Sequence, residues 1–141
     1  MSGSFVSATI LTDASNAKNG ALLKVIFADP GSGWTSAFTA SKDPSVWPVV
    51  YVGSAVPNNT INVMGNSTDG PTFESSPALN GSNLEMTVRL TGYVYSGESS
   101  VTVSISSGFI TDSLGNTSGY TSISAVTNNS TKTAGSAISR M

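Results

Sequence analysis

The stretch SSVTVSISSGFITDSLGNTSG, residues 99–119, decides the fold of this chain. Apolar Val101, Val103 and Ile105 alternate in it with polar residues, and this period of two is typical of a β-strand with one buried face. The alternating run is followed by glycine, asparagine and aspartate, which favour tight turns. We therefore expect a strand that leads into a sharp corner at residues 112–116.

The corner is interpreted as a structural turn. An oxygen of Asp112 can accept a hydrogen bond from the backbone amide two residues on, Gly115 can adopt the left-handed conformation, and Asn116 also tolerates it. Calcium would need about six to eight oxygen ligands, several of them from carboxylates, and the corner supplies a single carboxylate. An ion site stays open as the alternative, with further ligands from acids elsewhere in the chain: Asp43, Asp69 and Glu74.

Alternation of apolar and polar residues is also clear in residues 84–95, upstream of the corner. The turn residues Ser96 and Gly97 lead from this run to residues 101–105, so we predict that the two runs pair as an antiparallel hairpin. Shorter apolar runs bounded by turn residues predict further strands at residues 5–11, 21–28, 49–52, 60–64 and 120–127. No segment has the length and period of an amphipathic helix, and the pattern predicts an all-β sandwich or barrel.

Other segments are less regular. Asn19 and Gly20 suit a hairpin turn, and residues 34–40 are compatible with either a strand or a short helical turn. Residues 65–83, rich in Ser, Asn and Gly, predict a long loop that forms a lobe or an interaction surface. We expect a single domain over residues 1–141 with extended arms at about residues 1–7 and 128–141.

The composition excludes several classes of function. Only 10% of the 141 residues are charged and the net charge is −2, so the six basic residues leave no electrostatic footprint for nucleic acid. The absence of cysteine excludes disulfides and thiolate metal sites, and the absence of histidine removes the commonest general base. We expect no enzymatic activity, no cofactor and no metal.

We also find no targeting or membrane signal in the sequence. The N-terminal residues show no basic region followed by a long apolar run, so we expect no secretory signal and synthesis in the cytoplasm. The longest apolar stretch, residues 46–56, is shorter than the roughly 20 residues of a membrane helix, and we expect no membrane partner.

Residues 99–119 resemble the late-strand segment of bacterial Ig-like domains, in which an alternating strand leads through a glycine and an apolar pair into a D-x-x-G-N corner. The resemblance implies an antiparallel Ig-like β-sandwich. Residues 20–30, GALLKVIFADP, have the order of strand and acidic turn that suits an early strand of such a fold. Ig-like sandwiches serve adhesion, scaffolding and ligand binding alike, so the resemblance bears on fold more than on function.

Together these features resemble a phage capsid decoration (cement) protein. We expect such a protein to perform no chemistry, to bind at capsomer junctions on the virion surface and to stabilise the head. Its partners would be the major capsid protein and copies of itself, with a trimer as one candidate homo-oligomer. The candidate interface residues are Phe5, Val46, Trp47, Val49, Val50, Tyr51 and Ile138.

A recognition or adhesion module is the alternative hypothesis. It would bind a glycan or a protein receptor on a phage or bacterial surface. The contacts would come from the loop of residues 66–83 or from an aromatic platform, whose candidates are Trp34, Trp47, Tyr51, Tyr93 and Tyr95.

Overall fold

The computed structural model describes residues 2–3, 5–12, 21–53, 59–98, 100–119, 121–123 and 126–131. These residues form an all-β protein with no α-helix and one 3-10 turn, η1 (Pro44–Val46). The strands are β1 (Ser2–Gly3), β2 (Phe5–Thr12), β3 (Ala21–Phe27), β4 (Phe38–Ala40), β5 (Val49–Val52), β6 (Asn59–Asn62), β7 (Gly65–Asn66), β8 (Gly70–Pro71), β9 (Phe73–Asn80), β10 (Asn83–Arg89), β11 (Val101–Ile105), β12 (Ile110–Asp112), β13 (Thr117–Ser118), β14 (Thr121–Ile123) and β15 (Thr127–Asn128).

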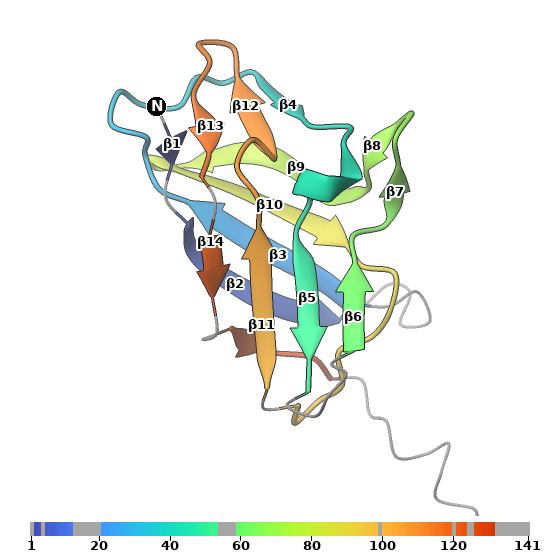
Figure 1. Ribbon diagram of the computed structural model, residues 1–141. Coiled ribbons are helices and arrows are strands. Elements are labelled where there is room, and N and C mark those ends of the chain that lie inside the picture. The colour runs from blue at the N-terminus through green and yellow to red at the C-terminus, as the bar shows by residue number, and fades with distance from the viewer. Residues whose placement is uncertain are drawn as a thin grey trace, which may run out of the picture.

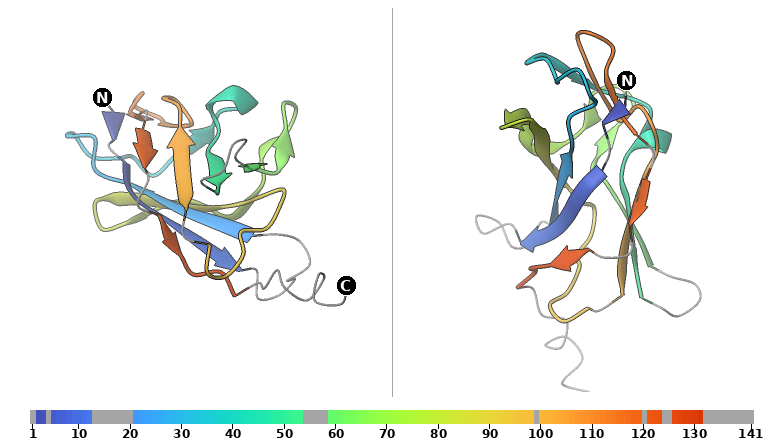
Figure 2. Two further views of the ribbon diagram at one scale, coloured as in Figure 1. Left: turned by 60° about the horizontal axis from the view of Figure 1, so that its bottom comes forward. Right: turned by 90° about the vertical axis from the view of Figure 1, so that its left-hand side faces the viewer.

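Two sheets face each other as the layers of a sandwich (Figures 1 and 2). One layer has five strands in the order β15-β2-β3-β10-β9, and the other has four in the order β14-β11-β5-β6. Strands β4, β12 and β13 extend the four-stranded layer at its upper end in Figure 1, where they form a small sheet with β1 in the order β1-β13-β12-β4. A two-stranded ribbon, β7-β8, completes the fold.

The hydrophobic core lies between the two layers. Alternate residues of β10 and β11 point into it, as a period of two requires when one face of a strand is buried. Each layer supplies residues to one continuous cluster, which shows that the sheets form one sandwich. Its fully buried members include Phe27, Phe109, Ile10, Leu23, Leu84, Met86, Ile105, Val50 and Val88.

Several predicted strands are confirmed. Strands β5 and β11 have the predicted bounds, and β2 and β3 differ from the predictions by one residue at their C-terminal ends. The short strand predicted at residues 60–64 is β6, followed by an isolated bridge between Val63 and Leu90. In the ambiguous segment 34–40, only β4 is extended. The turn predicted at Asn19 and Gly20 lies outside the described residues, although β2 and β3 do pair as antiparallel neighbours.

The predicted hairpin between residues 84–95 and residues 101–105 is wrong. Strand β10 ends at Arg89 and pairs with β3 and β9, whereas β11 pairs with β5 and β14 in the opposite layer. Both runs have one apolar face, and in a sandwich those faces meet across the core instead of lying side by side in one sheet. The connection between them therefore crosses from one layer to the other, and Val94 within it is buried.

The predicted long loop at residues 65–83 is also wrong. Most of this segment is the ribbon β7-β8 and the strand β9, which lies at the edge of the five-stranded layer. An edge strand is exposed on one side, so it can be polar and can hold Pro77 without losing a hydrogen bond in the middle of the sheet. Its polar composition is explained by this edge position.

The N-terminal arm predicted at residues 1–7 is contradicted by the strands β1 and β2. Strand β1 pairs in parallel with β13, and the amide of Gly119 donates to the carbonyl oxygen of Gly3 over 3.0 Å. Gly3 fits because it has no side chain: a Cβ atom there would collide with the Trp34 ring and with the carbonyl oxygen of Ala28. These contacts make the N-terminal residues part of the sandwich.

The C-terminal predictions are corrected in part. The single strand predicted at residues 120–127 is divided into β14 and β15, which belong to opposite layers. Strand β15, where the predicted arm begins, pairs in parallel with β2, and the amide of Asn129 donates to the carbonyl oxygen of Ile10 over 2.9 Å. The remainder of the predicted arm, residues 132–141, lies outside the described residues, and so does Ile138.

Candidate functional site

The corner at residues 112–116 joins β12 to β13 and is built around one buried carboxylate. Asp112 is 6% exposed, and its oxygens accept hydrogen bonds from four donors. The Oδ1 atom accepts from the amides of Leu114 (3.0 Å) and Asn116 (2.8 Å), and Oδ2 accepts from the Thr35 amide (3.0 Å) and from Asn116 Nδ2 (2.9 Å). Burial raises the pKa of Asp112, but these hydrogen bonds outweigh burial and lower the pKa to about 2.

The predicted turn chemistry is confirmed at this corner. The bond from the Leu114 amide to Asp112 spans two residues, and Gly115 has a φ of 87°, in the left-handed region. No described residue other than glycine has a positive φ, so Asn116 contributes through its amide group, which also donates to the Gly33 carbonyl oxygen over 3.1 Å. The contact with Gly33 ties the corner to a loop more than 80 residues earlier in the chain.

The acids proposed as partners for an ion site do not join Asp112. The Asp43 carboxylate caps η1 by accepting from the amide and hydroxyl of Ser45, which lower the pKa of Asp43. Glu74 forms an ion pair with Arg89, and Asp69 accepts a hydrogen bond from the side chain of Asn66. Within the described ranges no three Asp, Glu, His or Cys side chains are grouped so that they could hold a metal ion. The Asp112 carboxylate is therefore used in holding the corner.

Two of the interface candidates are core residues. Trp47 is 5% exposed and its Nε1 atom donates to the carbonyl oxygen of Ser41 over 2.7 Å, and Val50 is fully buried. Both are interface candidates from the sequence, and in this structure the chain's own core covers them. Val46 is half-buried against the core, and of Phe5 only the backbone, in β2, is described.

The other two candidates, Val49 and Tyr51, lie side by side on the outer face of β5. They are half-buried, while Val50 and Val52 between and beyond them point into the core. Cross-strand neighbours on the same face are polar but uncharged, and strands β5, β6, β11 and β14 contain no charged residue. We call this surface the uncharged face; its members are Val49, Tyr51, Thr60, Asn62, Thr102 and Ser104.

A groove of about 470 Å³ adjoins the uncharged face beside η1. Trp47 lies in its wall, and Val49 and Asn62 belong both to the groove and to the uncharged face. No charged side chain lines it. We call it the tryptophan groove; its lining residues are Pro44, Ser45, Trp47, Pro48, Val49, Asn62, Val63, Gly65 and Thr91.

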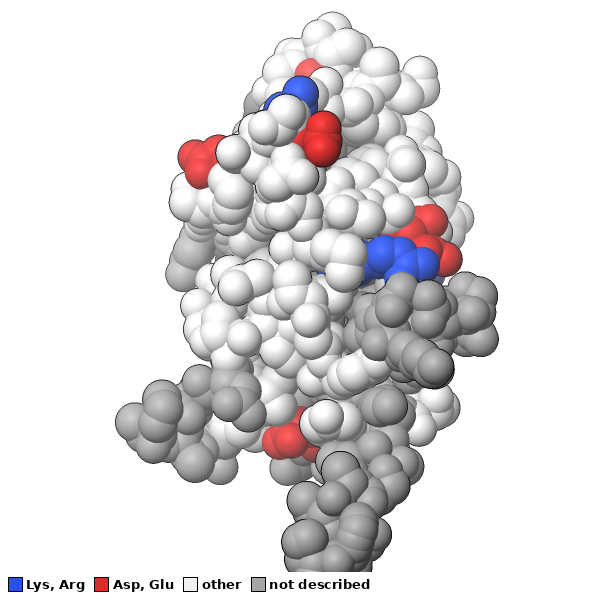
Figure 3. Space-filling view, turned by 90° about the vertical axis from the view of Figure 1, so that its right-hand side faces the viewer, with Lys and Arg blue, Asp and Glu red and all other residues white. Residues whose placement is uncertain are grey.

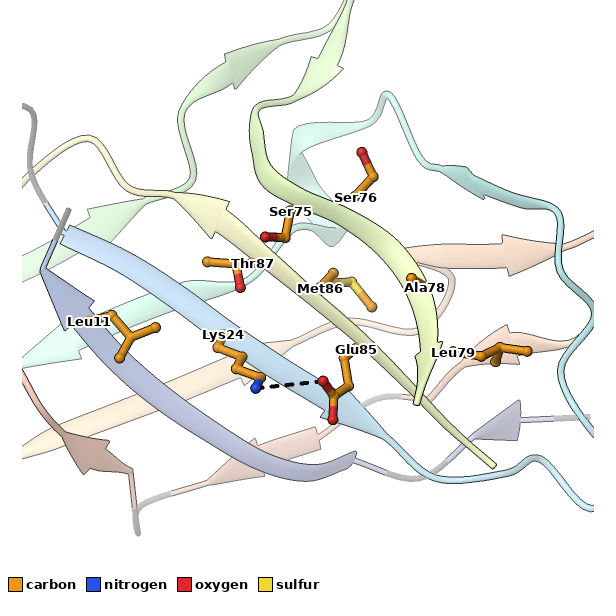
Figure 4. A pocket seen from close by; sticks show the side chains of 9 residues that line it. All are labelled: Leu11, Lys24, Ser75, Ser76, Ala78, Leu79, Glu85, Met86 and Thr87. Atoms are coloured by element: carbon orange, nitrogen blue, oxygen red, sulfur yellow. Dashed lines mark ion pairs between the residues drawn. The ribbon is translucent and has the colours of Figure 1, made fainter. Parts of the chain in front are cut away.

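A second, smaller hollow of about 330 Å³ lies on the five-stranded layer, next to β9 (Figure 4). The pairing of β9 with β10 shifts register twice, as bulges do, and bends the edge strand. Lys24 Nζ and Glu85 Oε1 lie 3.6 Å apart in the hollow, and Glu85 Oε2 accepts from Asn80 Nδ2 over 3.0 Å. Glu85 thus has one cationic and one amide partner at this hollow.

The aromatic residues proposed as a platform are distributed between core and surface. Trp34 is buried and its Nε1 atom donates to the Ala28 carbonyl oxygen, so Trp34 and Trp47 belong to the core and not to a platform. Tyr93 and Tyr95 lie together, with ring centroids 6.2 Å apart and an interplanar angle of 27°, and Tyr95 is exposed.

Two contacts of the corner could not be predicted from the sequence. The Thr35 amide binds Asp112 across 77 positions, and a backbone donor of this kind can belong to any residue type. Ser118, fully buried in β13, accepts from the Ile110 amide through its hydroxyl oxygen, but one serine among many in the chain could not be singled out beforehand.

Charged side chains are sparse on the surface shown in Figure 3. On the side shown in Figure 3, basic side chains lie beside acidic ones and most of the surface is uncharged. In the described part of the chain no helix is long and apolar enough to cross a membrane. Comparison with family models, curated proteins and solved structures finds no match to this chain.

Proposed function

We propose that the chain is a structural virion protein with an Ig-like sandwich fold, a phage capsid decoration protein that binds at capsomer junctions and stabilises the head. The observation that carries the proposal is the uncharged face, where the interface candidates Val49 and Tyr51 lie next to each other on the outer side of β5. Interfaces are depleted of charged residues at their centres and enriched in tyrosine. The Ig-like part of the proposal is supported by the two facing layers and by the D-x-x-G-N corner.

In this proposal the protein contributes buried area and no chemistry. The uncharged face would lie on the major capsid protein, and each bound copy would link neighbouring subunits against internal pressure. A specific interface of this kind buries about 1,200 Å² or more in total. The use of the buried Asp112 carboxylate in holding the corner supports a non-enzymatic role.

The test compares capsids with and without the protein under heat and osmotic shock. We expect heads that lack it to rupture under milder conditions, and re-addition of the purified protein to restore them. Tyr51→Glu should abolish the rescue because it places a charge on the uncharged face, whereas Tyr95→Glu should preserve it. Heads that survive equally well without the protein would refute the cementing role.

A recognition module is the second candidate, and the stacked pair of half-buried Tyr93 and exposed Tyr95 favours it. Aromatic rings of this kind can bind the apolar faces of sugars. In a glycan array, binding by the intact chain that is lost in Tyr95→Ala and kept in Tyr51→Ala would favour this function. No binding by the intact chain would count against it.

A further inference from the structure

Asn80 and Gly81 lie at the turn that joins the edge strand β9 to β10. The turn consists of Gly81 and Ser82, between the paired residues Asn80 and Asn83. Gly81 has a φ of 64°, and a Cβ atom there would meet nothing within 4 Å. Asn80, Gly81 and Ser82 are all exposed, so solvent reaches the peptide bond between Asn80 and Gly81.

An asparagine that is followed by glycine is chemically reactive. The backbone nitrogen of the following residue can attack the carbonyl carbon of the asparagine side chain and form a five-membered imide ring. A side chain on the following residue hinders this attack, and glycine has none. Among the asparagines that the structure describes, Asn80 alone precedes a glycine.

The Asn80 side chain is also weakly held. Its Nδ2 atom donates to Glu85 Oε2 over 3.0 Å, and its Oδ1 atom accepts no hydrogen bond from the described residues. Asn66 and Asn128, which lie in or beside other turns, each take part in three side-chain hydrogen bonds, including at least one from a backbone amide to Oδ1. The carbonyl carbon of Asn80 is therefore the least constrained of the three.

Local opening of the turn makes ring closure possible. In the structure Asn80 has the extended conformation of β9, and its backbone must rotate before the Gly81 nitrogen can reach its side chain. β9 has β10 as its one neighbour in the sheet, and the end of β9 is exposed. Exposed strand ends with few packing contacts open at little cost in free energy, while the core stays folded. The reactive conformation is thus accessible from the folded sandwich.

We propose that Asn80 is a site of spontaneous deamidation. The Gly81 nitrogen forms a bond to Asn80 Cγ, the bond between Cγ and Nδ2 breaks, and Nδ2 leaves as ammonia with the proton of the Gly81 amide. Water then opens the imide at either of its two carbonyl carbons, which leaves aspartate or isoaspartate at position 80. The sequence of steps involves no oxidation or reduction.

The product places a second carboxylate beside Glu85. An oxygen replaces the Nδ2 donor that now contacts Glu85 Oε2, and like charges at this separation repel each other. Lys24 Nζ, 3.6 Å from Glu85 Oε1, can balance one of the two charges. Isoaspartate also lengthens the backbone and so disturbs the pairing of Asn80 with Asn83. We therefore expect deamidation to loosen the end of the β9–β10 hairpin, whatever the function of the chain.

Mass spectrometry of the full-length folded chain tests the reaction. Cleavage after glutamate places Asn80 in the peptide of residues 75–85, apart from Asn19, which also precedes a glycine. After incubation at mildly alkaline pH, fragmentation of the peptides should show conversion of Asn80 before Asn66 and Asn128, with isoaspartate among the products. Asn80→Gln should stay unmodified at this position, because its longer side chain forms the imide far more slowly.

Two outcomes of this experiment would overturn the inference. In one, Asn80 stays intact in the folded chain but is converted in the chain unfolded by urea, which would show that the hairpin protects it. In the other, Asn66 is converted first in the folded chain.

Hydrogen exchange tests the structural consequence. Asn80→Asp reproduces one product, and the amides of Leu84 and Glu85 should exchange up to about fivefold faster in it than in the unmodified chain. Combining it with Glu85→Gln removes one of the facing carboxylates and should cancel the increase. Asn66→Asp adds the same charge at another turn and should leave both amides unchanged. Unaltered exchange in Asn80→Asp would show that the new carboxylate does not loosen the hairpin, against the inference.

Discussion

The corner at residues 112–116 and the edge strand β9 are both short, serine-containing stretches with an acidic residue, yet the two acids are held in different ways. Asp112 is buried and accepts four hydrogen bonds, three of them from backbone amides in two segments of the chain. The Glu74 side chain is 38% exposed and has Arg89 as its ion-pair partner. The difference teaches that the contribution of an acidic side chain to folding stability depends on how deeply it is buried and on how many hydrogen-bond donors contact it.

The largest expected effect is that of Asp112→Asn. The new amide group would place N–H donors against the donors that now bind the carboxylate, so we expect a loss of about 3 kcal/mol in the free energy of unfolding. Urea unfolding followed by tryptophan fluorescence measures it. Asp69→Asn, in an exposed turn, serves as the control and should change stability by less than about 0.5 kcal/mol. Equal effects of the two changes would contradict the comparison.

Lowering the pH should also destabilise the corner. The pKa of Asp112 is about 2 in the folded protein and 3.8 in the reference state, so its contribution is complete well above pH 3.8 and is lost as the pH falls through that value towards 2. The loss should be roughly 2 kcal/mol. The stability gap between the unmodified chain and Asp112→Asn should therefore shrink between about pH 5 and pH 2. A constant gap would show that the carboxylate charge is not responsible.

Gly115→Ala should cost about 1 kcal/mol. A Cβ atom at Gly115 would meet nothing within 4 Å, so the cost comes from the positive φ alone. Gly92→Ala is the matched control, since its Cβ would make an ordinary contact with Ile61 and its φ lies outside the strained region. Thermal unfolding of both variants separates the effect of the positive φ from the effect of an added Cβ atom. Similar melting temperatures would argue against backbone strain at the corner.

Glu74→Gln should have the smallest effect, less than about 1 kcal/mol, because an exposed ion pair is screened by solvent. Raising the salt concentration should reduce this effect further. Unfolding at low and high salt tests both statements. A loss as large as that of Asp112→Asn would remove the distinction between the two regions.

Local patterns carried most of the information that the sequence held about the fold. The alternation in residues 101–105 and the apolar run at residues 49–52 fixed the strand bounds, and the D-x-x-G-N pattern predicted the Asp112 turn, because in each case the cause lies within a few residues. The resemblance to Ig-like domains led to the expectation of a sandwich, and the two facing layers agree with it.

Strand pairing and burial, which depend on residues far apart in the sequence, could not be predicted from local patterns. A period of two does not say which strand is the neighbour, so β10 and β11 were paired wrongly. An exposed edge strand such as β9 has the composition of a loop. Trp47 is buried in the core of its own chain. The sequence could not show this, because an apolar residue that is covered by the core cannot be distinguished in a sequence from one that is covered by a partner protein.

The pairing of β1 with β13 and of β2 with β15 joins the first residues of the chain to its last strands. A ribosome releases the N-terminal strands long before their partners have been synthesised. Until then, the edges of β1 and β2 that pair with β13 and β15 have no partner. The sandwich can be completed only after residues 117–128 have been synthesised. Contacts of such high sequence separation slow folding. During synthesis these unpaired edges are open to pairing with other chains.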